Sequence, residues 1–225
     1  MTQLLKYEDF LYRVDELGFM AFSNILEGLP SLSAETPEQI WHTGDPETDP
    51  WRWKDRAAEE KRLAFGCILG GNKGFVSARM YPVFLAACHP RQSMEERRYD
   101  GLVSQTAWEL WKLFEDRKIL DTGEIRRQMG VDRKKGAARV DTAIGELQQY
   151  FYITVAGSRQ KTDKSGMPYG WHVNVYNRVE DWAPESWLKD SQSINRMDAI
   201  EEILDAGTVI GSGINRARLT KTLGL

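Results

Sequence analysis

The sequence has few of the residues that build disulfide frameworks or metal sites. Its 225 residues include two cysteines, Cys67 and Cys88, and three histidines, His42, His89 and His172. The cysteines lack the spacing of a metal-ligand pair, and the histidines lie too far apart for a motif such as H-x-x-x-H. We therefore expect no metal, no cofactor and no disulfide. Free cysteines fit a reducing, cytoplasmic environment.

Long apolar runs and phosphate-binding loops are also missing. No run reaches the roughly 18 apolar residues that cross a membrane, and residues 1–6 lack the basic start and apolar core of a secretion signal. The glycine run at 70–74 does not have the P-loop spacing G-x-x-x-x-G-K-[ST]. It fits a hairpin turn that needs positive φ, and a phosphate cradle is the weaker alternative. We also find no internal repeat. A membrane partner is not expected.

Basic residues are concentrated in the middle of the chain. Residues 1–100 hold 12 Lys and Arg against 16 Asp and Glu, which gives a net charge of −4. Residues 101–178 hold 13 against 9, and residues 179–225 hold 5 against 8, which gives +4 and −3. The central segment is the one with a net positive charge, and a positive patch attracts phosphates. Asp141 and Glu146 moderate the charge of this segment.

The positive segment has the element order of a winged helix-turn-helix. Apolar spacing predicts a helix over 106–118, a short strand at 119–120, a helix from Thr122 that ends at Gly130, and a long helix. The long helix buries a stripe made of Val140, Ile144, Leu147 and Phe151. Residues near 153–156 and 171–175 alternate as two strands, with Trp171 in step with the inward Val173 and Val175 and with His172 outward. They predict a hairpin, or wing, with a long polar tip over 157–170.

The basic side chains of this segment suit a nucleic-acid groove. The face of the long helix opposite its apolar stripe predicts base-edge contacts from Lys135, Arg139 and Thr142. Phosphate contacts are expected from the other basic residues near the helix entries and on the hairpin, which are Arg126, Arg127, Arg133, Lys134, Arg159, Lys161 and Lys164. The predicted partner is double-stranded DNA. Winged helices that bind only protein, or another copy of themselves, are the alternative.

Residues 1–100 are expected to form a helical region that resembles a degenerate winged helix. The pattern predicts a helix over 4–22 that Gly18 ends or kinks, a helix begun by Asp49 and Pro50, strands at 63–69 and 75–77, and a helix capped by Ser77. Two tryptophans, Trp51 and Trp53, stand among basic residues. They either stack on a base or pack beneath the winged helix, which is the more usual role of large aromatic residues.

Residues 181–225 read as a helical tail. Asp198 is expected to cap a helix that ends at Gly207. The basic piece at 214–223 is either a frayed end or part of a second helix-turn-helix. The predicted fold class is therefore α+β and mainly helical, with a winged helix-turn-helix over 101–180, the winged-helix-like region over 1–100 and the tail over 181–225.

Five short motifs resemble the AlkZ-related proteins. They are Gly18-Phe19-Met20, Asp49-Pro50-Trp51-Arg52-Trp53-Lys54, Ala64-Phe65-Gly66, Lys73-Gly74-Phe75 and Tyr81-Pro82. These proteins are similar to the winged-helix superfamily that includes AlkZ-type DNA glycosylases, so the resemblance, over about residues 1–180, implies a winged-helix fold and a link to DNA repair. In the glycosylases a Gln-x-Gln or Gln-x-Asp motif carries the chemistry. No glutamine of this chain has Gln, Asp or Glu two positions later.

We therefore expect a DNA-binding winged-helix protein related to AlkZ-type DNA repair proteins, without the usual glycosylase motif. One alternative is a DNA glycosylase that acts on alkylated bases through a carboxylate or amide outside that motif, with its catalytic residue unknown. The other is a non-catalytic scaffold that forms a homo-oligomer through the hairpin.

Overall fold

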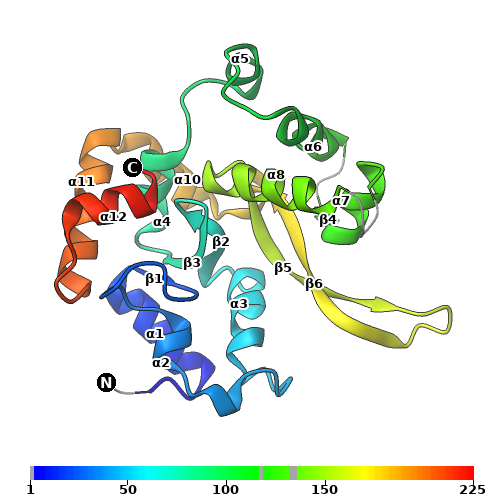
Figure 1. Cartoon of the computed structure of the whole chain (residues 1–225), viewed down its shortest axis with the longest axis horizontal. Helices are drawn as coiled ribbons and strands as arrows, with labels where there is room; N and C mark the ends of the chain where they lie inside the picture. Colours follow the sequence, from blue (N-terminus) through cyan, green and yellow to red (C-terminus); the bar gives the residue numbers. More distant parts are fainter. Residues whose placement is uncertain (1–2, 117–118, 132–135) are drawn as a thin grey trace.

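The computed structural model describes residues 3–116, 119–131 and 136–225. This part of the chain is an α+β structure with twelve α-helices, one short 3-10 helix and two three-stranded antiparallel sheets. Figure 1 shows the hairpin β5–β6 projecting away from a body made of the other elements. Within the described residues, no helix combines the length and the apolar content that crossing a bilayer requires.

The N-terminal half contains the first sheet and the helices around it. Its elements are α1 (Tyr7–Leu17), β1 (Phe19–Ala21), α2 (Leu32–Glu35), η1 (Glu38–Ile40), α3 (Pro50–Glu59), β2 (Leu63–Leu69) and β3 (Asn72–Ser77). Strand β3 lies between β1 and β2 and is antiparallel to both. Gly18 ends α1 with a φ of 85° and donates its N–H to the Val14 carbonyl at 2.8 Å. Gly18 therefore ends the helix predicted over 4–22, which was one of its two predicted effects, and residues 19–21 pair with β3.

Local signals set the start of α3 and the β2–β3 turn as predicted. The Asp49 side chain accepts the N–H of Trp51, and Pro50 occupies the first turn of α3. Gly70 and Gly71 have φ values of 62° and 84° and form the predicted hairpin turn between β2 and β3, while residues 72–74 of the run belong to β3. Trp53 is fully buried and stacks on Phe10 with ring centroids 5.6 Å apart.

Two helices connect the halves of the chain: α4 (Tyr81–Cys88) and α5 (Met94–Tyr99). Ser77 does not cap α4. Its hydroxyl accepts the N–H of Met80 at 3.3 Å and closes a turn that precedes the helix. Pro82 lies in the first turn of α4, where a missing N–H costs no helical hydrogen bond.

The second sheet repeats the topology of the first. Its elements are α6 (Gln105–Asp116), β4 (Ile119–Asp121), α7 (Thr122–Gln128), α8 (Ala137–Gln149), β5 (Ile153–Thr162) and β6 (Pro168–Arg178). In both sheets one strand follows the first helix, two strands follow the later helices, and the last strand lies in the middle. The order of helices and strands predicted for 101–180 is therefore present, and it also occurs in the N-terminal half.

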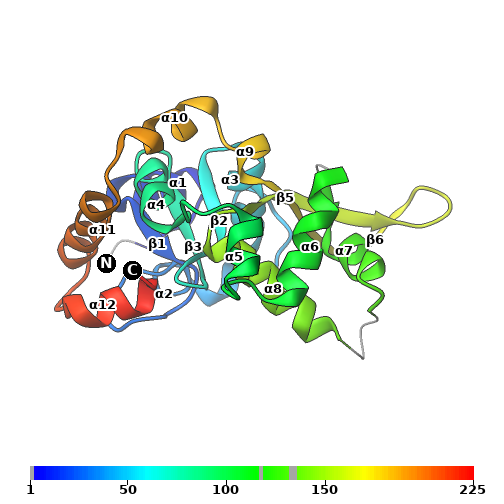
Figure 2. The ribbon, with the colours of Figure 1, turned by 90° about the horizontal axis from the view of Figure 1, so that it is seen from above.

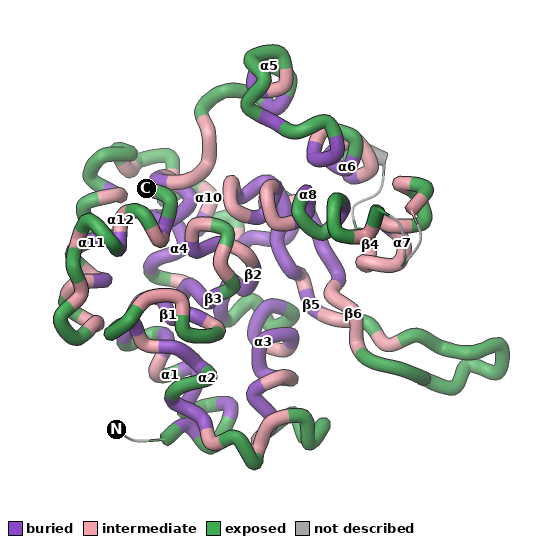
Figure 3. Tube along the Cα trace, viewed as in Figure 1, coloured by how far each residue is buried: buried purple, intermediate pink, exposed green. Residues whose placement is uncertain are grey.

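Two details of this second half differ from the prediction. Helix α8 ends at Gln149, and Phe151 has a φ of 55°, so Phe151 lies outside the helical stripe and turns the chain into β5. The hairpin strands are also longer than predicted, and they leave only residues 163–167 between them. Figure 3 shows the outer part of both strands as exposed.

The two halves pack against each other reciprocally. Helix α3 of the first half lies against β5, and helix α8 of the second half lies against β2. A glycine marks each approach: a Cβ on Gly66 of β2 would lie 2.5 Å from the Gln148 side-chain oxygen, and one on Gly157 of β5 would lie 3.3 Å from Glu59 Cβ. A single buried cluster accordingly joins Phe10, Trp53 and Leu147 from both halves.

The C-terminal helices lie on the part of the molecule away from the tip of the hairpin β5–β6 (Figure 2). They are α9 (Val179–Trp182), α10 (Glu185–Ser193), α11 (Arg196–Ile210) and α12 (Arg216–Leu223), and α10 and α11 pack on α4 in a second buried cluster. Asn195, rather than Asp198, caps α11, whose last residue is Ile210 and not a residue near Gly207. The final helix is ordered and ends beside the β2–β3 turn, where Asn72 donates to the Thr222 carbonyl at 3.3 Å.

Candidate nucleic-acid interface

A hollow of about 590 Å³ lies between α7 and the hairpin β5–β6. Four of the predicted DNA-binding residues line it: Arg126 and Arg127 from the last turn of α7, and Arg159 and Lys161 from β5. The two pairs are more than thirty positions apart in the sequence, and the fold brings them to one concave surface. A concave surface that carries basic side chains from two elements can follow a phosphate backbone.

The start of α7 is fixed against the hairpin by hydrogen bonds. Strand β4 pairs with β6 up to Asp121 and Val175. The Asp121 carboxylate then accepts the N–H groups of Gly123 and Glu124 at 2.7 and 2.9 Å, and the Glu124 side chain accepts the Asp121 N–H at 2.8 Å. This capping box leaves the last turn of α7 to carry the two arginines into the hollow.

Carboxylates neutralise part of the positive charge around the hollow. Arg126 donates to both oxygens of Asp141 on α8, and Arg159 lies 3.7 Å from Asp121 and 3.8 Å from Glu124. Arg127 and Lys161 are exposed, and neither has an ion pair within the described part of the chain. The positive charge open to a ligand therefore comes mainly from Arg127 and Lys161.

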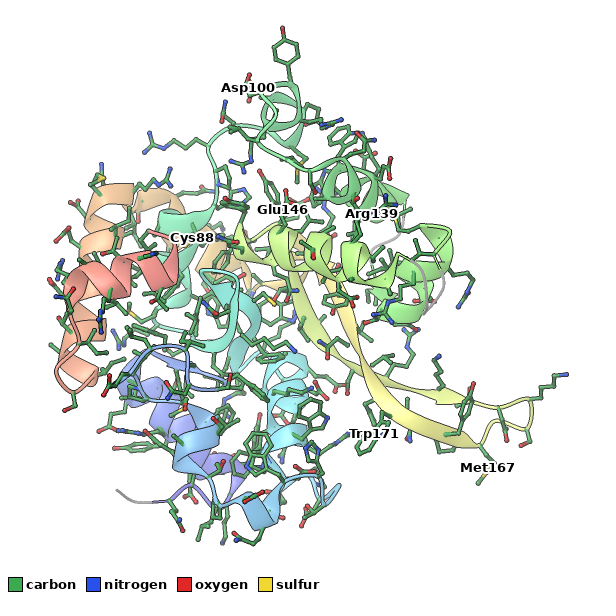
Figure 4. All side chains as sticks on the ribbon, in the orientation of Figure 1. Cys88, Asp100, Arg139, Glu146, Met167 and Trp171 are labelled. Atoms are coloured by element: carbon green, nitrogen blue, oxygen red, sulfur yellow. The ribbon has the colours of Figure 1, made fainter. Side chains whose placement is uncertain are left out.

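The other predicted contact residues do not all converge on this hollow. Lys164 is exposed near the hairpin tip, and Arg139 and Thr142 are exposed on α8. Figure 4 places Arg139 with Glu146 on the side of α8 that faces α6, away from the hairpin. The Thr142 hydroxyl donates to the Ala138 carbonyl at 2.9 Å, within its own helix. The remaining predicted residues, Arg133, Lys134 and Lys135, lie outside the described residues.

Three large apolar side chains are exposed on the hairpin. Met167, Tyr169 and Trp171 are 64%, 53% and 74% exposed. The predicted inward position of Trp171 was wrong, because the strand pairing shifts between Arg159 and Lys161 and breaks the alternation. Figure 4 shows Trp171 on the side of the hairpin that faces α3, and its ring lies 6.1 Å from that of His42.

His172 was expected to point outward, but it is half-buried within strand β6 of the hairpin. Its Nδ1 lies 3.1 Å from the Ser158 hydroxyl. Burial lowers the pKa of His172, and the nearby Arg52 guanidinium lowers it further. The imidazole is therefore neutral at pH 7 and adds no positive charge to the interface.

A smaller hollow of about 220 Å³ lies where α8 meets both hairpins. Gln148 spans its wall: its side-chain oxygen accepts the Cys67 N–H at 3.2 Å, and its amide nitrogen donates to the Ile144 carbonyl at 3.2 Å. Burial raises the pKa of the Cys67 thiol and of the Tyr176 hydroxyl, so both stay protonated at neutral pH. Cys67 is accordingly not a thiolate nucleophile.

A buried ion pair lies beside this hollow on α3. The side chains of Lys54 and Asp55 are 6% and 4% exposed and form a salt bridge, and Asp55 Oδ2 has no hydrogen-bond partner among the described residues. The Lys54 ammonium lies 4.7 Å from the Trp51 ring centroid. Burial lowers the pKa of Lys54, against the opposing effect of Asp55. Sequence reasoning missed this pair because α3 packs on β5 as well as on β2, and β5 comes from the other half of the chain.

The described residues contain no candidate metal site built from His, Cys and carboxylate side chains. No group of three or more such side chains is placed there to hold a metal ion.

Comparison with known proteins identifies the family. A family model described as AlkZ related matches residues 4–224. This chain belongs to the AlkZ-related family. The resemblance based on the short motifs covered about residues 1–180. The family match is longer and includes the C-terminal helices. The family name links the chain to AlkZ-type DNA repair proteins. Neither the curated proteins nor the solved structures contain a match.

Two of the five motifs that carried the resemblance of this AlkZ-related chain line the smaller hollow, and a third lies beside it. Phe65, Gly66 and Lys73 line it, and the Lys54 ammonium lies 5.6 Å from the Phe65 ring centroid. Gln148 is the glutamine in its wall, and the residue two positions later is Tyr150. The hollow therefore contains an amide without the Gln-x-Gln or Gln-x-Asp pattern of the glycosylases.

Proposed function

We propose that this AlkZ-related protein binds double-stranded DNA in the hollow between α7 and the hairpin, as a cytoplasmic protein of DNA repair. The observation that carries this proposal is the convergence of Arg126, Arg127, Arg159 and Lys161 on one concave surface. Basic side chains that contact phosphates release counterions, which supplies most of the affinity of sequence-independent binding. The family membership supports the same partner.

We infer that residues 101–180 form a winged helix-turn-helix, with α7 and α8 as the helix pair and β5–β6 as the wing. The strand order β4-β6-β5 and the helix order support this assignment. Residues 1–100 repeat that order as a degenerate winged helix, and residues 181–225 are a helical extension. Helix α3 is the counterpart of α8 and is covered by β5. The first unit therefore supports the DNA-binding unit and does not supply a second recognition helix.

In this proposal the side chains divide into two groups. Arg126, Arg127, Arg159, Lys161 and Lys164, together with Arg133 and Lys134, contact phosphates, while Lys135 and Thr142 contact base edges. Arg139 was predicted to join them, but it lies on the side of α8 that faces α6 and stays outside this surface. Met167 and Tyr169 of the hairpin then enter the minor groove, where Met and aromatic residues can wedge between base steps. Phosphate contacts give affinity and position, and base and wedge contacts give selectivity.

Binding of a fluorescent 20-base-pair duplex, followed by anisotropy, tests the proposal. Arg127→Gln plus Lys161→Gln removes two open charges and is expected to weaken binding about tenfold or more near 50 mM salt, since each phosphate contact adds to counterion release. Arg218→Gln plus Lys221→Gln on α12 is the matched control with the same change in net charge, and it should leave binding nearly unchanged. Equal losses in both variants contradict the proposed surface.

A DNA glycosylase is the second candidate, and the buried Asp55 favours it. A carboxylate with an unpartnered oxygen, held beside Trp51 and Lys54, has the chemistry to activate water or to stabilise an oxocarbenium-like sugar. Incubation with oligonucleotides that carry alkylated bases, followed by chromatography for free base, tests this activity. Release by the wild type that is lost in Asp55→Asn supports it, and no release by the wild type leaves the protein as a DNA-binding protein.

A further inference from the structure

A third hollow, of about 410 Å³, lies behind the junction of α8 and β5. Its walls come from α4, α10, the start of α11 and the segment that joins α8 to β5. Its floor is apolar and includes Leu85, Phe151, Val179 and Leu188. Small-molecule sites commonly have volumes of roughly 300–1,000 Å³, apolar walls and a few polar groups, and this hollow has each of these properties.

The mouth of the hollow is positively charged. Arg91 and Arg196 are both exposed at its rim. The Nε of Arg196 donates to the Ala87 carbonyl at 3.0 Å, which holds the side chain in place and leaves its terminal nitrogens for another acceptor. The one carboxylate in the lining, Glu180, forms a salt bridge with Arg178. An anionic group at the mouth would therefore meet two arginines.

The inner wall is uncharged. The Nδ1 of His89 lies 3.0 Å from the Tyr150 carbonyl, which can only accept, so Nδ1 carries the proton. Burial lowers the pKa of His89, and its Nε2 is an unprotonated acceptor at neutral pH. The aromatic rings of Trp111 and Tyr152 complete this wall, with centroids 5.5 Å apart. These groups suit the aromatic or aliphatic body of a ligand.

The floor contains the strained residue of the α8–β5 junction. Phe151 has a φ of 55°. This conformation costs a bulky residue roughly 1–3 kcal/mol, and residues strained in this way are concentrated at functional sites in proteins. Two backbone hydrogen bonds hold the turn: the Phe151 N–H donates to the Gln148 carbonyl at 3.0 Å, and the Tyr152 N–H donates to the Leu147 carbonyl at 2.9 Å. A molecule in the hollow would contact the residue that sets the direction of β5 relative to α8.

We propose that this hollow binds a small amphipathic carboxylate. Its aromatic or aliphatic body packs on Phe151, Trp111 and Leu188, and its carboxylate accepts hydrogen bonds from Arg91 and Arg196. Arginine is suited to this role because its planar guanidinium matches the geometry of a carboxylate. The proposal is independent of DNA binding, because the hollow and the α7–hairpin surface share no lining residue.

Calorimetric titration of the full chain with 1-naphthaleneacetate and with the uncharged 1-naphthaleneacetamide tests the proposal. The carboxylate is expected to bind saturably and about tenfold more tightly than the amide, since a charge-assisted hydrogen bond contributes more than a neutral one. Arg91→Gln plus Arg196→Gln should remove that preference. Both arginines are exposed, so the variant is expected to fold.

Two further variants separate this site from weak surface binding. Ser191→Trp adds an indole to the half-buried lining of α10 and is expected to abolish binding of both probes, while Arg218→Gln plus Lys221→Gln on α12 should change neither. The proposal is overturned if the carboxylate does not saturate, if it shows no preference over the amide, or if the Arg91 and Arg196 double variant binds it as tightly as the wild type.

Discussion

Arg126 on α7 donates two hydrogen bonds to the carboxylate of Asp141 on α8, at 2.7 and 2.8 Å. The pair ties the two helices together at the edge of the basic hollow. It also neutralises one of the four basic side chains that line the hollow. Because both side chains are partly exposed, the pair contributes little to the free energy of unfolding, and its main effect is on the charge presented to a ligand.

Asp141→Asn should therefore increase the affinity for DNA. The change frees the Arg126 guanidinium, so we expect binding to tighten by about three- to tenfold and the slope of log affinity against log salt to steepen by about 0.9. Stability should change by less than about 1 kcal/mol. Anisotropy titrations at four salt concentrations measure the slope, and unchanged or weaker binding would show that Arg126 does not contact DNA.

Gly66 of the first half lies close to Gln148 of the second half, so a larger residue at position 66 should lower the stability of the protein. In Gly66→Ala the new methyl group displaces the Gln148 side-chain oxygen and leaves the Cys67 N–H without its acceptor, at a cost of about 1–3 kcal/mol. Gly145→Ala, on α8 with no atom within 4 Å of the added Cβ, should instead stabilise by about 0.5–1 kcal/mol. Urea unfolding measures both changes, and equal effects in the two variants would contradict the packing argument.

The buried Lys54–Asp55 pair should show strong coupling. Asp55→Ala leaves the Lys54 ammonium buried without its carboxylate and is expected to lower the free energy of unfolding by about 3 kcal/mol. Lys54→Met plus Asp55→Ala removes both charged groups and should recover at least about half of that loss. A double-mutant cycle measured by urea unfolding gives the coupling, and additive losses would mean that the pair is not coupled in solution.

Histidine burial predicts how stability changes with pH. The pKa values of His89 and His172 are lowered in the folded protein, first by burial. The unfolded chain takes up these protons as the pH falls through about 6.5, and the folded chain does so only at lower pH. The free energy of unfolding should therefore fall between pH 7.5 and 5.5. His89→Asn plus His172→Asn should flatten this part of the curve, and an equally steep curve would rule out the two histidines as its cause.

Elements set by local chemistry could be predicted from the sequence. Asp49 and Pro50 marked the start of α3, the glycines of the β2–β3 turn marked the hairpin, and the alternation around Val155 and Val175 marked strands β5 and β6. The four basic residues that line the hollow were also predictable as candidates, because a surplus of basic residues is visible in composition alone.

Features that depend on packing between distant segments could not be predicted. Strand β1 is three residues long and exists because β3 pairs with it, and the sequence shows no repeat although both halves share one topology. Helical spacing continues to Phe151, but its positive φ ends α8 two residues earlier. Helix α3, which carries Asp55, packs on β5 of the other half, and no local pattern indicates this contact.

Hydrogen–deuterium exchange in the presence of a saturating duplex tests the proposed DNA surface most directly. Amides of α7, of the first half of α8 and of the hairpin β5–β6 should exchange more slowly with DNA than without it, while those of α11 and α12 should not change. Protection centred on α11 and α12, or no protection of α7 and the hairpin under conditions where the duplex is bound, would contradict the account.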